Sequence, residues 1–96
     1  MAYVVAATWR AREGEEDAIA RLLETMVPLF QAEPACRIFQ AHRSTEDSRE
    51  FFLYEQYDDE AGFQAHLATE GFKRHVLEDA VPRLEHRARV FYVTMD

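Results

Sequence analysis

The sequence predicts an α+β fold in which two helices cover one face of a four-stranded antiparallel sheet. Three observations lead to this prediction: an amphipathic helical pattern after residue 15, separate runs rich in valine and aromatic residues, and the order of these segments. The chain has 96 residues, 48% of them hydrophobic, and no low-complexity tract. We therefore expect a single domain over residues 1–96 with a thin core.

The first strand is predicted over residues 2–10, and a turn around Gly14 follows it. From Glu15 the apolar residues recur with the i, i+3, i+4, i+7 spacing of a helix, whose acidic start suits the positive end of the helix dipole. Pro28 removes a backbone hydrogen bond, so the helix is predicted to kink or end near Val27. The apolar positions of this helix are Ile19, Leu22, Leu23, Met26, Val27 and Phe30.

Two strand-like runs follow the helix and are predicted to pair as a hairpin. They cover residues 36–43 (CRIFQAHR) and 51–57 (FFLYEQY), and the polar loop 44–49 separates them. The single cysteine, Cys36, begins the first run and has no second cysteine with which to form an internal disulfide. We interpret it as a small, buried apolar residue.

A second helical region lies between this hairpin and a final strand. Asp58 and Asp59 can cap its start, and Pro82 ends it after two short helices or one broken helix. Residues 87–95 return to strand character. The order β-α-β-β-α-β is the ferredoxin-like pattern, in which right-handed crossovers place both helices on the same face of an antiparallel sheet.

Both faces of the predicted sheet are apolar, although helices can cover only one of them. An exposed apolar face of roughly several hundred Å² is typical of an interface rather than of a soluble monomer. We therefore expect a homodimer packed sheet to sheet about a two-fold axis. In the first strand the two faces carry Tyr3, Val5, Ala7 and Trp9 on one side and Val4, Ala6 and Thr8 on the other.

Charge and segment composition exclude several classes of partner. Eighteen acidic residues against eleven basic ones give a formal net charge of -7, so phosphate backbones and anionic lipids would repel the chain. The apolar start MAYVVAATW is short, has no basic lead and alternates like a strand, which indicates neither a signal peptide nor a membrane span. We expect a cytoplasmic protein without nucleic-acid or membrane partners.

Several kinds of chemistry lack the residue patterns that they need. The three glycines form no phosphate-binding loop, and the four histidines show neither HExxH spacing nor a neighbouring cysteine cluster. No serine stands in a GxSxG turn. The sequence thus gives no support for a metal, a nucleotide or a flavin, and we expect no cofactor.

Two polar residues in apolar surroundings, Glu55 and His66, are the candidate catalytic residues. Glu55 interrupts the strand FFLYEQY and would need a partner when buried, for which Arg37, Arg87 or Arg89 is available. His66 borders the helix face that meets the sheet, and its ordinary pKa near ~6.5 suits proton transfer at neutral pH. Spacing alone favours a structural role for both residues.

The segment from Glu55 to Phe72 resembles a known family. It follows the pattern E-x-[WY]-x-[DS]-x-x-x-[FL]-x-x-H-x-x-[ST]-x-x-[FM], and the whole chain is similar to the antibiotic biosynthesis monooxygenase (ABM) family of dimeric α+β barrel proteins. The residues that carry the pattern are Glu55, Tyr57, Asp59, Phe63, His66, Thr69 and Phe72.

The resemblance implies a function and roles for individual residues. Several members are oxygenases that need no cofactor and act on quinols, anthrones or related polycyclic aromatics, whereas others isomerise small metabolites or have no assigned activity. His66 would then deprotonate or orient a substrate hydroxyl group, and Glu55 would fix the hydrogen bonding of the pocket. The residues implied to bind the aromatic substrate are Phe39, Tyr57, Phe63, Phe72 and Trp9.

The haem-degrading branch of the superfamily fits this chain poorly. That branch uses an asparagine where Ala7 stands, a tryptophan in place of His66, and a proximal histidine from which His75 is about one residue out of register. The sequence therefore favours a cofactor-independent monooxygenase that acts on quinol-like or polycyclic aromatic substrates with molecular oxygen. A noncatalytic dimeric ligand-binding or stress-response protein, and an isomerase of a small carbonyl metabolite, are the alternatives.

Overall fold

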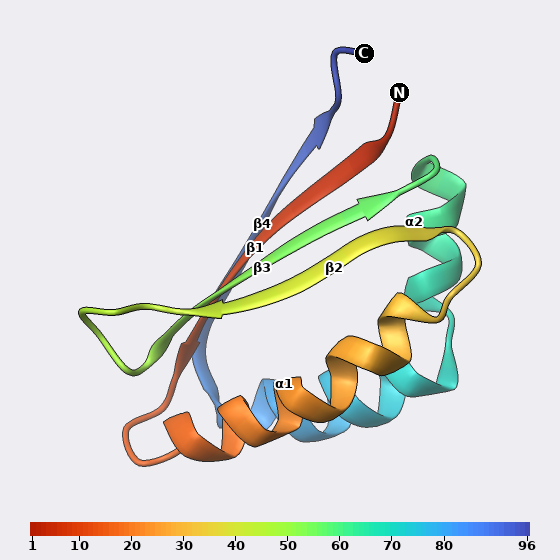
Figure 1. Cartoon of the computed structure of the whole chain (residues 1–96). Coiled ribbons are helices and arrows are strands. Elements are labelled where there is room, and N and C mark those ends of the chain that lie inside the picture. Colours follow the sequence, from red (N-terminus) through yellow and green to blue (C-terminus); the bar gives the residue numbers. More distant parts are fainter.

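The computed structural model describes residues 1–96 and confirms the predicted α+β fold with its ferredoxin-like order. One antiparallel sheet has the strand order β2-β3-β1-β4, and the helices all lie on one of its faces (Figure 1). The strands are β1 (Tyr3–Ala11), β2 (Cys36–Arg43), β3 (Glu50–Tyr57) and β4 (Leu84–Val93). The helical elements are α1 (Glu16–Gln31), α2 (Glu60–Leu67), the π-helix η1 (Phe72–Ala80) and the 3₁₀-helix η2 (Val81–Arg83).

β1 is a central strand, paired with β3 on one side and β4 on the other. Val5, Ala7 and Trp9 alternate along it and are buried beneath the helices. Ala7 lies opposite Leu53 of β3 and Arg89 of β4, so a small side chain separates two larger ones on this face. A cavity lined by the candidate site residues lies above this alanine.

α1 packs its predicted apolar stripe against the sheet. Its buried residues are spaced by three or four positions, as a helix with one apolar face requires. The sequence predicted that this helix would kink or end near Val27. It does not end there, because α1 includes Pro28 and continues to Gln31. Pro28 and Glu24 are exposed, so water can reach the carbonyl that loses its helical partner, while buried Met26 and Phe30 anchor the helix on either side.

The second helical region is divided into α2 and η1, with the short η2 directly after η1, so the first of the two predicted arrangements, separate short helices, is the one observed. The Asp59 carboxylate caps α2 by accepting a hydrogen bond from the backbone N–H of Gly62 at 2.8 Å. The hydroxyl oxygen of Thr69 accepts a hydrogen bond from the N–H of Phe72 at 3.0 Å, where η1 begins. The π-helical form of η1 has no counterpart in the sequence prediction. The last strand begins at Leu84, earlier than the predicted residue 87.

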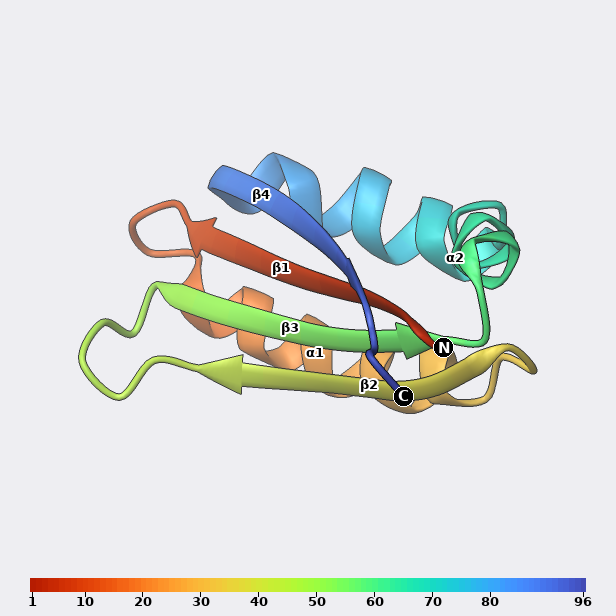
Figure 2. The same ribbon diagram turned by 90° about the horizontal axis from the view of Figure 1, so that it is seen from above.

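The other face of the sheet carries no helix, as the view onto the sheet shows (Figure 2). Large apolar side chains are open to solvent on it: Phe52 is 40% exposed, Val90 50% and Tyr92 55%. They lie in register with Thr8, Ala6 and Val4 of β1, the alternate set to the residues that face the helices. None of the helices is long and apolar enough to cross a lipid bilayer.

Candidate functional site

A small cavity lies between the sheet and the helices, above Ala7. Its volume is about 30 Å³, which is room for a water molecule or two or for a diatomic gas, since one water needs roughly 10–15 Å³ on this measure. Both candidate catalytic residues, Glu55 and His66, line it. The remaining lining residues are Ala7, Trp9, Met26, Phe30, Phe39, Leu53, Phe72, Val76, Arg87 and Arg89.

His66 projects from α2 into the apolar interior and is 3% exposed. Its Nδ1 lies 3.0 and 3.1 Å from the two carboxylate oxygens of Glu33, in the turn that follows α1. The imidazole is surrounded by aromatic rings, with Phe30 edge-on at a centroid distance of 4.6 Å and Phe72 edge-on at 5.2 Å. Packing and the hydrogen bond to Glu33 therefore fix the orientation of the ring.

The second ring nitrogen of His66, Nε2, has no hydrogen-bond partner in the chain, and we infer that it faces the cavity that His66 lines. No buried nitrogen or oxygen of any side chain lacks a hydrogen-bond partner, and Nε2 has no partner within the chain, so Nε2 must reach open space. Burial, with the positive charge of Arg89 as the second cause, lowers the pKa of His66 to about 4. The imidazole is therefore neutral at pH 7.

Glu33 determines which nitrogen of His66 carries the proton. Burial raises the pKa of Glu33 to about 7. Above that pH its carboxylate can only accept a hydrogen bond, so Nδ1 must donate and Nε2 keeps its lone pair. Below that pH a protonated Glu33 donates to Nδ1 and the ring proton moves to Nε2. Ionised Glu33 thus leaves a free base at the cavity.

Glu55 projects from β3 into the same cavity and is 5% exposed. Its Oε1 accepts a hydrogen bond from the Tyr57 hydroxyl at 2.7 Å. Burial raises the pKa of Glu55 to about 7, although the hydrogen bond from Tyr57 and the charge of Arg89 oppose the rise. Near neutral pH this carboxyl group can therefore either give or take a proton.

The hydrogen-bond partner of Glu55 was not among those that the sequence suggested, although the charge of Arg89, one of the three arginines considered, does act on Glu55. Arg37 pairs instead with Asp58 at 2.8 Å, and the hydrogen bond to Glu55 comes from Tyr57. Tyr57 follows Glu55 by two residues on the same strand, so both side chains point to the same face. The E-x-Y spacing within a strand was the signal from which this pair could have been inferred.

Three of the five residues expected to bind substrate, Phe39, Phe72 and Trp9, line the cavity. The other two, Tyr57 and Phe63, are buried beside it, with ring centroids 5.4 and 6.2 Å from that of His66. These rings pack against one another and fill the space that an aromatic substrate would need. Ligand pockets usually measure about 300–1,000 Å³, so a substrate ring can enter only if some of these side chains move.

Three charged residues of the site were not assigned to it from the sequence. Glu33 lies in the turn after α1, and only the tertiary contact between that turn and α2 brings it to His66. Arg87 and Arg89 were considered only as partners for Glu55, whereas both line the cavity. Nowhere in the chain do three His, Cys, Asp or Glu side chains converge as a metal site would require.

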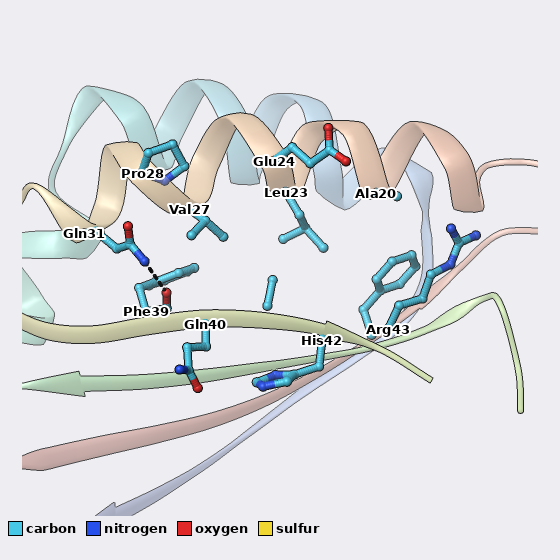
Figure 3. Close-up of a pocket in the computed structure, with 12 residues that line it drawn as sticks. Ala20, Leu23, Glu24, Val27, Pro28, Gln31, Phe39, Gln40, His42 and Arg43 are labelled. Carbon is cyan, nitrogen blue, oxygen red and sulfur yellow. Dashed lines mark hydrogen bonds between the residues drawn. The ribbon is translucent and has the colours of Figure 1, made fainter. Parts of the chain in front are cut away.

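A larger groove of about 730 Å³ lies elsewhere, between α1 and the edge strand β2 (Figure 3). Leu23, Val27 and Phe39 point into it, and the Gln31 side-chain amide donates to the Phe39 carbonyl at 3.1 Å across it. Its titratable side chains are all exposed, and of the candidate site residues it contains only Phe39. The buried acid and base groups thus lie in the small cavity and not in the large groove.

The sequence model of the family described as "Antibiotic biosynthesis monooxygenase" matches residues 2–77. This chain belongs to the antibiotic biosynthesis monooxygenase family. The match includes Glu33, Glu55 and His66, and it ends before β4 and its two arginines. No curated protein matches the chain in sequence.

Solved structures agree with the assignment of the ABM fold. PA3566 from Pseudomonas aeruginosa is 26% identical, with a TM-score of 0.90 over 99% of this chain and 95% of its own. Rv0793 from Mycobacterium tuberculosis is 21% identical, with a TM-score of 0.90 over 100% of this chain and 97% of its own. A structure described as an antibiotic biosynthesis monooxygenase is 23% identical and has a TM-score of 0.89, with complete coverage of both chains.

The buried Glu55 should make the stability of this ABM protein depend on pH. Its pKa rises from 4.5 to about 7 on folding, so between these values the unfolded chain ionises first and the free energy of unfolding falls by roughly 3 kcal/mol. Glu55→Gln removes this dependence and still accepts the hydrogen bond from Tyr57. Urea denaturation should therefore show that the free energy of unfolding of the variant, relative to that of the wild type, increases by roughly 2–3 kcal/mol between pH 5 and pH 8.

Glu24→Gln is the matched control, because Glu24 is exposed and has no partner. It should follow the wild type at both pH values. A constant difference between Glu55→Gln and the wild type across this range would show that Glu55 does not titrate in the folded state as its burial requires.

Proposed function

We propose that the protein is a cofactor-independent monooxygenase in which His66 removes a proton from an electron-rich aromatic substrate and the resulting anion reacts with dioxygen. The observation that carries the proposal is the free Nε2 of His66, which faces a cavity shared with Glu55 while Nδ1 is held by Glu33. The family of the chain and a structural neighbour described as a monooxygenase support it. A base with a fixed orientation is what general base catalysis requires.

The chemistry balances without a further reductant when the substrate is a CH₂ group activated by a neighbouring carbonyl or phenol. Proton removal gives an enolate or phenolate, which passes one electron to dioxygen and so avoids the spin barrier. Radical recombination then forms the C–O bond of a peroxide, which takes up a proton. Loss of water leaves a carbonyl group, so that CH₂ and O₂ become C=O and H₂O.

The two carboxyl groups of the site have distinct roles in this proposal. Glu33 is a positioning residue, because its carboxylate makes hydrogen bonds only to His66 and keeps the ring proton on Nδ1. A protonated Glu55 can donate to the developing oxyanion or to the departing oxygen, and its pKa of about 7 suits that role. The cavity of about 30 Å³ is large enough for dioxygen, and the aromatic substrate enters by displacing packed rings.

The small cavity favours one alternative, the isomerisation of a small carbonyl compound. Such a reaction moves a proton between two carbon atoms and needs an acid and a base on one cavity, which Glu55 and His66 provide. It needs no space for dioxygen or for a polycyclic ring. Turnover in the absence of oxygen, with deuterium taken up from D₂O, would establish this activity in place of oxygenation.

We also propose that the protein is a homodimer that packs sheet to sheet. The uncovered face carries Phe52, Val90 and Tyr92, each at least 40% exposed. Exposed apolar side chains gathered on one face are typical of an interface. Burial of this face against a second copy about a two-fold axis would place the two helical layers on the outside.

Replacing the base should abolish oxygen consumption. With a panel of quinols and anthrones, His66→Gln should lower the rate of oxygen uptake by about 100-fold or more, since general base catalysis contributes roughly 10²–10⁴. An oxygen electrode measures the rate, and thermal unfolding verifies the fold. His75→Gln, on η1 and outside the cavity lining, should keep the wild-type rate. Equal rates for His66→Gln and the wild type would remove His66 from the mechanism.

The pH dependence of the reaction should report the ionisation of Glu33. Because Nε2 is a free base only when Glu33 is ionised, kcat/KM should rise about tenfold per pH unit below pH 7. Above pH 7 it should fall again, because Glu55 loses the proton that it donates. In Glu33→Gln the amide can donate to Nδ1 and hold the ring proton on Nε2, so kcat should fall across the whole range with little change in KM. Retention of the wild-type pH profile in this variant would contradict the role of Glu33.

A charge on the uncovered face should disrupt the dimer. Tyr92→Glu places a carboxylate where Tyr92 is 55% exposed, and sedimentation should shift from the mass of two chains to that of one. The matched control is Leu77→Glu on η1, which changes a residue of 45% exposure on the helical side and should leave the mass unchanged. A wild-type protein that sediments as a monomer would refute the proposed dimer.

A further inference from the structure

We infer that the substrate of this site carries an oxyanion, either a carboxylate or a phosphate group. Arg87 and Arg89 bind this group at the mouth of the cavity. The inference rests on the proposed function in one respect: it assumes that the reaction takes place in the cavity lined by His66 and Glu55. It defines the substrate class more narrowly than an electron-rich aromatic. Neither arginine lies within the residues that the family model matches.

The two arginines are placed at the entrance to the cavity. They alternate along β4, where Arg87 lies opposite Trp9 and Arg89 opposite Ala7, on the sheet face that the helices cover. Every other residue that lines the cavity is buried or half-buried, whereas these two are exposed. A molecule that approaches from solvent at the β4 edge therefore meets both guanidinium groups before it meets His66.

Neither arginine forms an ion pair within the chain. The ion pairs of the protein use other arginines, and Arg10 alone binds three carboxylates. The guanidinium of Arg89 lies over two aromatic faces, 5.6 Å from the ring centroid of Phe63 and 5.9 Å from that of Phe91, and its charge also acts on Glu55 inside the cavity. In a chain with a formal net charge of -7, two free cations at one entrance form a local site for anions.

The spacing of the two cations suits one shared anion. Residues two apart on a strand point to the same face about 6.6 Å from each other, and like charges at that separation repel. An oxyanion between them would relieve this repulsion and accept several N–H donors at once, as guanidinium groups bind carboxylates and phosphates. The remainder of the substrate would then extend over Ala7 towards His66 and Glu55.

Anion binding would also change the acid and base groups inside. The charge of Arg89 lowers the pKa of His66 because it repels the imidazolium form, and it lowers the pKa of Glu55 because it stabilises the carboxylate. A bound oxyanion cancels this charge, so both pKa values should rise when substrate is present. His66 would thereby become a stronger base only after the correct substrate has bound.

Binding of benzoate, phenyl phosphate and the neutral isostere benzamide tests the inference. NMR titration at low ionic strength should show at least one of the two anions binding about tenfold tighter than benzamide, since hydrogen bonds to charged groups are worth roughly 1.5–3 kcal/mol. Arg87→Gln and Arg89→Gln should each weaken that anion about tenfold and leave benzamide unchanged. The more strongly bound anion identifies carboxylate or phosphate as the preferred group.

Arg21→Gln is the matched control, because it removes the same charge from an exposed arginine on α1 that does not line the cavity. It should leave the affinity for the anion unchanged, and Arg89→Lys should retain part of it. Equal affinity of the wild type for all three compounds would overturn the inference. So would equal weakening by Arg21→Gln, or a loss of the dimer in the Arg87 and Arg89 variants without a loss of anion binding.

The titration is independent of turnover, so failure of this inference and failure of the proposed function are distinguishable. His66→Gln should still bind the anion, because the two arginines remain. Oxygen uptake that depends on His66, without any preference for anions, would support the monooxygenase and refute the oxyanion site. Anion binding that depends on both arginines, without oxygen uptake, would support the site and refute the monooxygenase.

Discussion

The hydrogen bond between Glu33 and His66 is the interaction on which the rest of the site depends. It connects the turn after α1 to α2, two segments far apart in sequence, in an apolar layer where an unpaired polar group would be costly. By taking one nitrogen of the imidazole, Glu33 orients the ring and leaves the other nitrogen towards the cavity. The sheet below supplies Glu55 and the small Ala7, but neither would face a usable base without this contact.

The fold was largely predictable because its determinants are local and repetitive. The apolar spacing of α1 and the alternation of β1 and β3 each specify an element and its buried face, and the order of elements leaves few topologies. Pro28 was misjudged because the cost of a missing helical hydrogen bond depends on whether water can reach the free carbonyl, which is a tertiary property. The π-helical form of η1 likewise depends on packing and not on local propensity.

The site was predictable only in part, for a related physical reason. Glu55 and His66 could be identified as polar residues in apolar surroundings, and the family resemblance placed both in one motif. In the sequence Glu33 is an acidic residue of a turn with nothing to distinguish it, and only folding brings it to His66. Arg87 and Arg89 belong to an exposed strand, so the sequence did not indicate a role in the site. The size of the cavity could not be predicted from the sequence, because it depends on how closely the surrounding rings pack.

Ala7 is a position at which the size and polarity of the cavity can change by a single substitution. The free space exists because one methyl group stands where neighbouring positions on the same sheet face carry Trp9, Leu53 and Arg89. A single codon change in the central strand could therefore enlarge, fill or polarise the cavity without altering the proposed proton-transfer groups around it. On this scaffold, the acceptance of new substrates could evolve separately from catalytic competence.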